Sequence, residues 1–327
     1  MACLLPNLSV NTGVGVLYLK FPGNADMNDR QSQFLPHERE NSAEILSEYP
    51  EHFGFAAELL RSGLELLDQL SKSNRFDDTP IVKAVAGGIL ARELRRYRSI
   101  ALMAECGFIE NVDVLTRVLF KGALSARFVL CKSIPAEEQS SQLRGRLRKQ
   151  PATPDGVSEL ELRSWLYSMS PNMKIALMAD QLGMDSELKR TILQGISEME
   201  QIIGPEWIEV LKTHPKTYSG LSIRDLAESR GLLSMYVEMY SLQSMDVHAS
   251  DGLASLDHGT EDGGDSVSFM IGTARHRIER LPTHMQMAFG VLLILLSDVG
   301  KAFGLNLTEV KEIRDSYDKL IHECDGS

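Results

Sequence analysis

The segments IVKAVAGGILARELRRYRSIALMAEC (81–106) and NVDVLTRVLFKGALSARFVLCK (111–132) decide the fold, and the short joint between them contains Gly107. In both segments apolar residues recur at spacings of three and four, which is the period of one face of an α-helix. Glycine is favoured just after the last residue of a helix. Because the joint is short, we expect two antiparallel helices that pack side by side at the centre of the protein. In the second helix the side chains expected to face inward are Val114, Leu115, Val118, Leu119 and Leu124.

Helical patterning continues on both sides of this pair. Ser42 is a suitable N-cap for a helix, and Phe53, Ala56 and Leu60 then begin another apolar face. A Ser-x-x-Asp capping box at Ser222 predicts the start of a long helix. Further helices are expected near residues 158–182, 185–203, 205–213, 222–248, 267–304 with a break at Pro282, and 308–324.

These patterns predict an all-α fold, with a single helical-bundle domain of about eight to ten helices over residues 43–325. Residues 1–42 contain scattered Gly and Pro and are expected to form an irregular, extended N-terminal arm. An internal linker is predicted near 150–157, where Pro and Gly gather. A mobile loop is predicted near 249–266, which is rich in Gly, Asp and Ser.

Composition and charge narrow the classes of protein to which the chain can belong. With 43% hydrophobic and 24% charged residues it is ordinary for a globular protein, so disorder along its whole length is not expected. The net charge of −11 argues against broad nonspecific binding to nucleic acid, because phosphates need a basic surface, although a local basic patch stays compatible. The four cysteines are scattered, which is typical of reduced thiols in a cytoplasmic protein.

The sequence carries no clear motif for a cofactor, a metal or a membrane span. It has no Walker loop, and Gly13-Val14-Gly15 lacks the third glycine of a dinucleotide site. The apolar run at 285–299 is interrupted by Gly290 and is too short to span a bilayer, so a buried helix is expected. Asp and His residues gather between 246 and 265, but their spacing matches no metal-binding loop and favours a solvated acidic loop. We therefore expect no cofactor, no metal and no membrane partner.

The most specific local feature is a row of polar side chains at Tyr236, Tyr240, Ser244 and His248. Residues four apart lie on one face of a helix, so these groups can form a hydrogen-bond chain. His248 is the natural acid or base of the row, because its unperturbed pKa lies near neutrality. The alternative is that the row ties its helix to neighbouring helices, which is the commoner use of buried Tyr and His.

The segment SIRDLAESRGLLSMYVEMYSLQSMDVHAS (222–250) resembles an uncharacterised family of bacterial helical proteins that carry a Tyr-x-x-x-Ser-x-x-x-His segment. An upstream pattern of that family is similar to SIALMAECGFIENVDVLTRVLFKGAL (99–124) here. The resemblance spans about residues 85–304. It implies a helical fold and a shared site made by Arg117, Tyr240, Ser244 and His248. The chain departs from the family pattern at Lys121, where that pattern has Glu, and this difference would alter the pairing of Arg117 or His248.

A second motif resembles the Arg-x4–6-His motif of helical HEPN-type ribonucleases, in which the Arg binds phosphate and the His helps to activate the ribose hydroxyl. Arg277 and His284 have the spacing of this motif. Ile278 stands where the motif usually has a polar residue, and Pro282 interrupts the turn between the two residues. The chemistry needs a cation beside a titratable base at the backbone phosphate.

Two arginine-rich stretches are further places for a binding surface. One contains Arg92, Arg95, Arg96 and Arg98, and the other is the segment 144–149. In a chain with a net charge of −11, the first expectation is pairing with acidic side chains of the same chain or of a second copy. RNA is the other partner compatible with these stretches.

Two function hypotheses follow from these residues. The first is a non-catalytic helical interaction or regulatory protein of bacterial stress or phage-defence biology, which binds a protein partner or its own copy. The second is a HEPN-like, metal-independent ribonuclease that uses Arg117 with His248 or Arg277 with His284. An Arg and a His side by side in an open basic cleft would favour the enzyme, and a sealed row would favour the interaction protein. A small-molecule sensor is a third hypothesis, since helical bundles often enclose ligand pockets.

Overall fold

The computed structural model describes residues 36–179, 181–214, 217–242, 256–259, 266–269 and 278–325, and the fold is all-α. The described residues contain twelve α-helices. These are α2 (Pro36–Glu48), α3 (Pro50–Lys72), α4 (Pro80–Glu105), α5 (Ile109–Leu130), α6 (Ser141–Leu147), α7 (Glu159–Met178), α8 (Ser186–Ile203), α9 (Pro205–Thr213), α10 (Ile223–Ser229), α11 (Leu233–Val237), α14 (Leu281–Phe303) and α15 (Thr308–Asp325). A 3-10 helix, η1 (Ala136–Glu138), a π-helix, η2 (Glu238–Leu242), and two strands, β1 (Leu256–Gly259) and β2 (Ser266–Phe269), complete the described elements.

The predicted central pair of helices is α4 and α5. Gly107 follows α4 with φ 77°, in the left-handed region that favours glycine, so the chain turns back at once into α5. Two contacts show that the helices are antiparallel: Arg96 bonds to the Val118 carbonyl, and Gly122 faces Glu93. Of the α5 side chains expected to face inward, Leu119 and Leu124 are buried, whereas Val114 is exposed.

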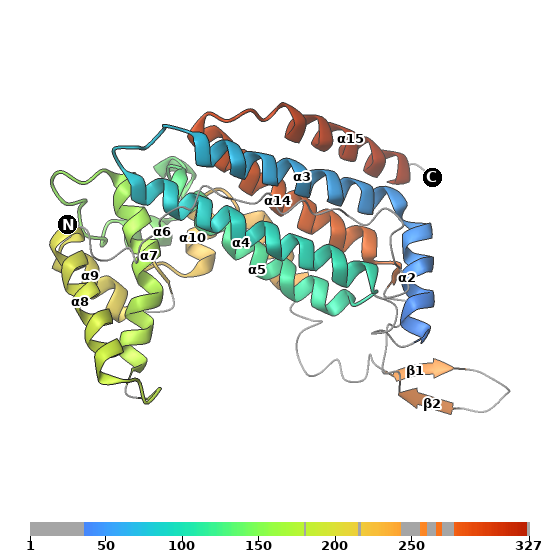
Figure 1. The fold of residues 1–327 in the computed structure, drawn as a ribbon, viewed down its shortest axis with the longest axis horizontal. Coiled ribbons are helices and arrows are strands. Elements are labelled where there is room, and N and C mark those ends of the chain that lie inside the picture. The colour runs from blue at the N-terminus through green and yellow to red at the C-terminus, as the bar shows by residue number, and fades with distance from the viewer. Residues whose placement is uncertain are drawn as a thin grey trace.

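The other helices pack around this pair in two groups. Figure 1 shows α3 and α14 beside α4 and α5, with α15 along the outer side of α3. At the other end of the molecule, α7 packs against both α4 and α5, and α8 and α9 pack on α7. Of this second group, α7 and α9 contribute to the walls of two cavities at this end, together with α6 and α10.

The most apolar helix is α14, which contacts α3, α4 and α5. Leu292, Leu295 and Val299 have no exposed surface. Among the described residues α14 is the one helix long and apolar enough to cross a membrane, and 56% of its most apolar window is buried. The central helix of a globular protein passes the same test, so this property says little about membrane insertion.

Several predicted boundaries were wrong. Helix α2 begins at Pro36, so the end of the predicted N-terminal arm is helical, while residues 1–35 lie outside the described part of the chain. The capping box between Ser222 and Asp225 is confirmed, but the long helix expected from it ends at Ser229, because Gly231 adopts φ 70° and the chain restarts as α11. Short helices such as α6, α10 and α11 raise the number above the eight to ten expected.

A strand pair lies in the segment expected to be a mobile loop and the start of a helix. β1 and β2 pair antiparallel, with Leu256 opposite Phe269 and Gly259 opposite Ser266. The sequence of β2, Ser-Val-Ser-Phe, alternates polar and apolar residues with the period of a strand. An alternation of only four residues is too short to predict a strand in a segment whose glycines favour a loop.

Two glycines of α14 provide a matched test of how tightly Leu307, in the segment after α14, packs against this helix. A Cβ at Gly300 would lie 2.8 Å from Leu307 Cγ, whereas a Cβ at Gly290 would have no atom within 4 Å. We expect Gly300→Ala to lower the free energy of unfolding by about 1–2 kcal/mol, because Leu307 must move. Gly290→Ala should raise it by up to about 1 kcal/mol through helix propensity. Urea unfolding measures both values, and equal effects would show that Leu307 does not pack tightly on α14.

Candidate functional site

Two of the four side chains in the predicted polar row, Tyr236 and Tyr240, lie among the described residues. The rings of Tyr236 and Tyr240 stack with their centroids 4.6 Å apart, as their spacing predicts. The guanidinium carbon of Arg117 lies 5.8 Å from the centroid of the Tyr240 ring, a cation–π contact between α5 and η2. Arg117 and Tyr240 are therefore brought together. Ser244, His248 and Arg277 lie outside the described residues.

The environment of Tyr240 keeps its phenol protonated. The pKa of Tyr240 is raised to about 12, mainly by burial and in smaller part by the Tyr236 side chain, while the Arg117 charge acts in the opposite direction. At neutral pH the phenol is protonated, and its buried hydroxyl has no hydrogen-bond partner among the described residues. The described part of the row therefore suits a packing contact better than proton transfer.

The predicted histidine of the Arg-x6-His motif, His284, is buried. Its Nδ1 lies 2.5 Å from Asp113 Oδ1, and the residue is 8% exposed. Pro282 lies in the first turn of α14, which begins at Leu281, so the proline starts this helix. Asp113 and His284 thus tie the N-terminal turn of α14 to α5 in the interior.

Asp113 and Arg117 lie one turn apart on α5, so they share a face of that helix. The cluster at this end of α5 combines Asp113 with His284, and Arg117 with Tyr240. Sequence reasoning missed Asp113. The available signal was its position one turn before Arg117, but nothing in the sequence connects it with a histidine so much later in the chain.

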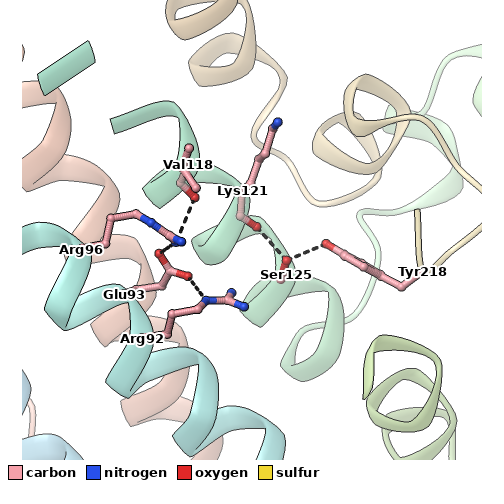
Figure 2. Close-up of polar contacts among 7 residues, drawn as sticks. All are labelled: Arg92, Glu93, Arg96, Val118, Lys121, Ser125 and Tyr218. Carbon is pink, nitrogen blue, oxygen red and sulfur yellow. Dashed lines mark hydrogen bonds and ion pairs between the residues drawn. The ribbon is translucent and has the colours of Figure 1, made fainter. Parts of the chain in front are cut away.

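A second polar cluster, centred on Glu93, crosses from α4 to α5 (Figure 2). The Glu93 side chain has no exposed surface; Arg92 Nε donates to one of its oxygens at 2.7 Å, and Arg96 Nη1 pairs with the other. The Cβ that Gly122 lacks would lie 2.6 Å from Glu93 Cγ, so only glycine at that position leaves room for the carboxylate. Part of the predicted cationic stretch is therefore paired within the chain, whereas Arg95 and Arg98 are exposed.

Further along α5, the hydroxyl of Ser125 joins this helix to the segment that precedes α10. It donates to the Lys121 carbonyl at 2.7 Å and lies 2.8 Å from the Tyr218 hydroxyl (Figure 2). Lys121 itself is exposed, so the residue that departs from the family pattern faces solvent. These contacts anchor the segment before α10 on α5.

The second arginine-rich stretch lines a cavity of about 600 Å³. Arg146, Lys149 and His214 lie on its wall, and Arg146 pairs with the capping-box carboxylate of Asp225. The cavity is wide enough for a small ligand. Within the part of the chain that is described, no group of three or more His, Cys, Asp or Glu side chains is placed to hold a metal ion.

The chain matches no protein-family profile, no curated protein and no solved structure. The resemblance to a bacterial helical family is therefore a prediction that rests on its short motifs. The site has to be interpreted from its own geometry.

The Glu93 cluster leads to a test of stability. We expect Glu93→Gln to lower the free energy of unfolding by about 2–4 kcal/mol, because two guanidinium groups lose their buried counter-charge. The matched control is Glu65→Gln on α3, whose carboxylate is exposed and 3.9 Å from Arg61. It should change stability by less than about 1 kcal/mol. Chemical denaturation measures both, and similar losses in the two variants would contradict a structural role for Glu93.

Proposed function

We propose that the chain is a non-catalytic helical interaction protein that associates with a second copy of itself. The observation that carries this proposal is an exposed apolar surface at the far ends of α7 and α8, here called the α7–α8 tip. Large apolar side chains exposed there belong to the end of α7, the following turn and α8. They are Ile175, Leu177, Met178, Leu182, Leu188 and Leu193.

The tip is unusual because its apolar residues are both large and highly exposed. Leu182 is 57% exposed and Leu188 is 52% exposed. The two helices extend away from the central helices, at the lower left of Figure 1. Burying such side chains is favourable by about 25 cal/mol for each Å² of apolar surface removed from water. Contiguous exposed apolar patches are typical of protein–protein contact sites.

A second copy suits this surface better than a strongly charged partner. The exposed residues of α8 beside the apolar positions include both signs of charge, for example Glu187 and Arg190. In a two-fold contact each patch meets its own copy, so opposite charges of the two copies can be paired around an apolar centre. The chain's net charge of −11 repels a second copy, so burial of apolar surface at the tip has to outweigh that repulsion.

The polar clusters inside the bundle support the non-catalytic proposal. His284 is held against Asp113 in the interior, and the phenol of Tyr240 packs against Arg117. A ribonuclease that used Arg277 with His284 would need the imidazole at an open surface. The regulatory role in bacterial stress or phage defence follows from the sequence resemblance alone.

Substitutions at the tip test the association. We expect Leu182→Lys with Leu188→Lys to weaken self-association by roughly 10- to 100-fold, because two apolar contacts are replaced by like charges. The control is Leu102→Lys on α4, where Leu102 is 40% exposed but lies outside the tip. Sedimentation equilibrium measures the dissociation constants. A wild-type chain that stays monomeric, or equal effects of the control, would overturn the proposal.

An RNA degradation assay tests the enzymatic alternative. We expect no cleavage of RNA by the purified chain in EDTA, nor by His248→Ala or His284→Ala. His284→Ala should be less stable to heat, because the buried carboxylate of Asp113 loses the imidazole. Cleavage by the wild-type chain that one histidine variant loses would establish the ribonuclease hypothesis and identify its histidine.

A further inference from the structure

A cavity of about 190 Å³ lies where the C-terminal end of α5 meets the first turn of α7 and the end of α10. Two arginines line it: Arg163 from α7, and Arg230, which follows α10. Each is only 6% exposed. Phe128 and Trp207 form part of the apolar wall. The cavity far exceeds the roughly 10–15 Å³ that one water molecule needs.

The two guanidinium groups converge on one neutral acceptor. Nη1 of Arg163 and Nη1 of Arg230 both donate to the carbonyl oxygen of Cys131, the second at 2.8 Å. Arg163 Nε donates to the Glu159 carbonyl at 3.2 Å. Arg230 Nε is buried, and none of the described residues accepts a hydrogen bond from it. A buried guanidinium nitrogen without an acceptor is costly and indicates a missing partner.

The charge at this cavity is also incompletely balanced. The carboxylate of Glu159 lies 3.9 Å from Arg163 Nη1, but its side chain is exposed, so solvent screens the pair. The carboxylate of Asp298 is paired with another arginine of α5, because Arg127 Nε lies 3.0 Å from Asp298 Oδ2. Arg230 is additionally held by the face of the Phe128 ring, 5.3 Å from its guanidinium carbon.

Burial weakens the binding of protons by both arginines, and at Arg230 the charge of Arg163 adds to this effect. Burial and then the charge of Arg163 lower the pKa of Arg230 to about 10, and burial lowers the pKa of Arg163. Arg230 still carries its charge at neutral pH, since a pKa of about 10 lies well above 7. The fold thus keeps two cations close together in a poorly solvated place, which an anion between them would relieve.

We propose that this cavity binds a phosphate group, either free or as part of a small metabolite, between Arg163 and Arg230. The planar forks of two guanidinium groups match phosphate oxygens, and two cations match a dianion better than a single carboxylate. Arg230 Nε supplies a donor that is otherwise unused. The volume is smaller than the roughly 300–1,000 Å³ of sites for drug-sized ligands. The ligand therefore carries at most a few carbon atoms, which contact Phe128 and Trp207.

The cavity adjoins the larger one of about 600 Å³, with which it shares Gln150, Ser219 and Leu221 in its wall. That larger cavity is lined by Arg146, which is paired with Asp225, and by Lys149. The Lys149 charge adds to the positive potential near the two buried arginines. The inference is independent of the α7–α8 tip, so either proposal can fail without the other.

The test compares ligands at constant ionic strength by thermal unfolding and isothermal titration calorimetry of the full chain. Inorganic phosphate, glycerol 3-phosphate and acetate are each compared with chloride. We expect phosphate or glycerol 3-phosphate to raise the Tm of the wild-type chain by about 2–4 °C and to bind measurably. Acetate should have at most a small effect.

Substitutions of Arg230 test whether phosphate binds in this cavity. Arg230→Met keeps the length of the side chain and its contact with Phe128, but it should weaken phosphate binding by at least about tenfold. Arg230→Lys keeps the charge but loses the fork and should also bind more weakly, while both variants retain wild-type circular dichroism. The matched control is Arg95→Met, which removes an exposed arginine of α4 and should bind as wild type does.

Three results would overturn the assignment: no response of the wild-type chain to either phosphate ligand, a response to acetate alone, or equal loss of binding in Arg95→Met. A response to glycerol 3-phosphate but not to inorganic phosphate would identify a phosphorylated metabolite as the ligand. The reverse would identify free phosphate.

Discussion

The packing of α4 against α5 around the buried carboxylate of Glu93 is the interaction on which the other helices depend. An ionised group with no exposed surface is stable only when opposite charges and hydrogen bonds replace its water, and Arg92 and Arg96 supply them. Gly122 lets the carboxylate approach α5, so the pairing also sets how far α4 can slide along α5. α14 and α3 then cover this pair, and α7 packs across it.

The two ends of α5 differ in how their charges are balanced, and this difference separates structure from binding. Near its start, the carboxylate of Asp113 meets His284, and Arg117 packs on an aromatic ring. Just beyond its end, Arg163 and Arg230 share a neutral carbonyl, and the carboxylate of Glu159, 3.9 Å from Arg163, is exposed. A cluster that pairs a carboxylate with an imidazole stabilises a fold, whereas a cluster with excess charge in a cavity is a place for a ligand. The second end is therefore where we place the ligand site.

Much of the fold, but little of the site, could be predicted from the sequence. Apolar spacing and Gly107 correctly predict the α4–α5 pair, and Ser222 with Asp225 correctly predicts a helix start, because these signals are local. The end of that helix at Ser229, two residues before Gly231, is not predicted, because a glycine within a helical pattern indicates either a break or a tolerated weak point. The pairs of Asp113 with His284 and of Arg163 with Arg230 join residues far apart in the sequence. Such pairs arise from how helices pack, and no spacing within one helix reveals them.

One helix, α7, carries both Arg163 and the apolar tip, and its own sequence separates the two. Pro171 lies inside α7 between them. A proline within a helix has no N–H to donate to the carbonyl four residues earlier, and its ring crowds that carbonyl, so the helix is bent or weakened there. Most of the buried residues of α7, including Arg163, precede Pro171, whereas the exposed side chains of the tip follow it. Pro171 therefore marks the boundary on α7 between the residues that line the cavity and those that form the tip.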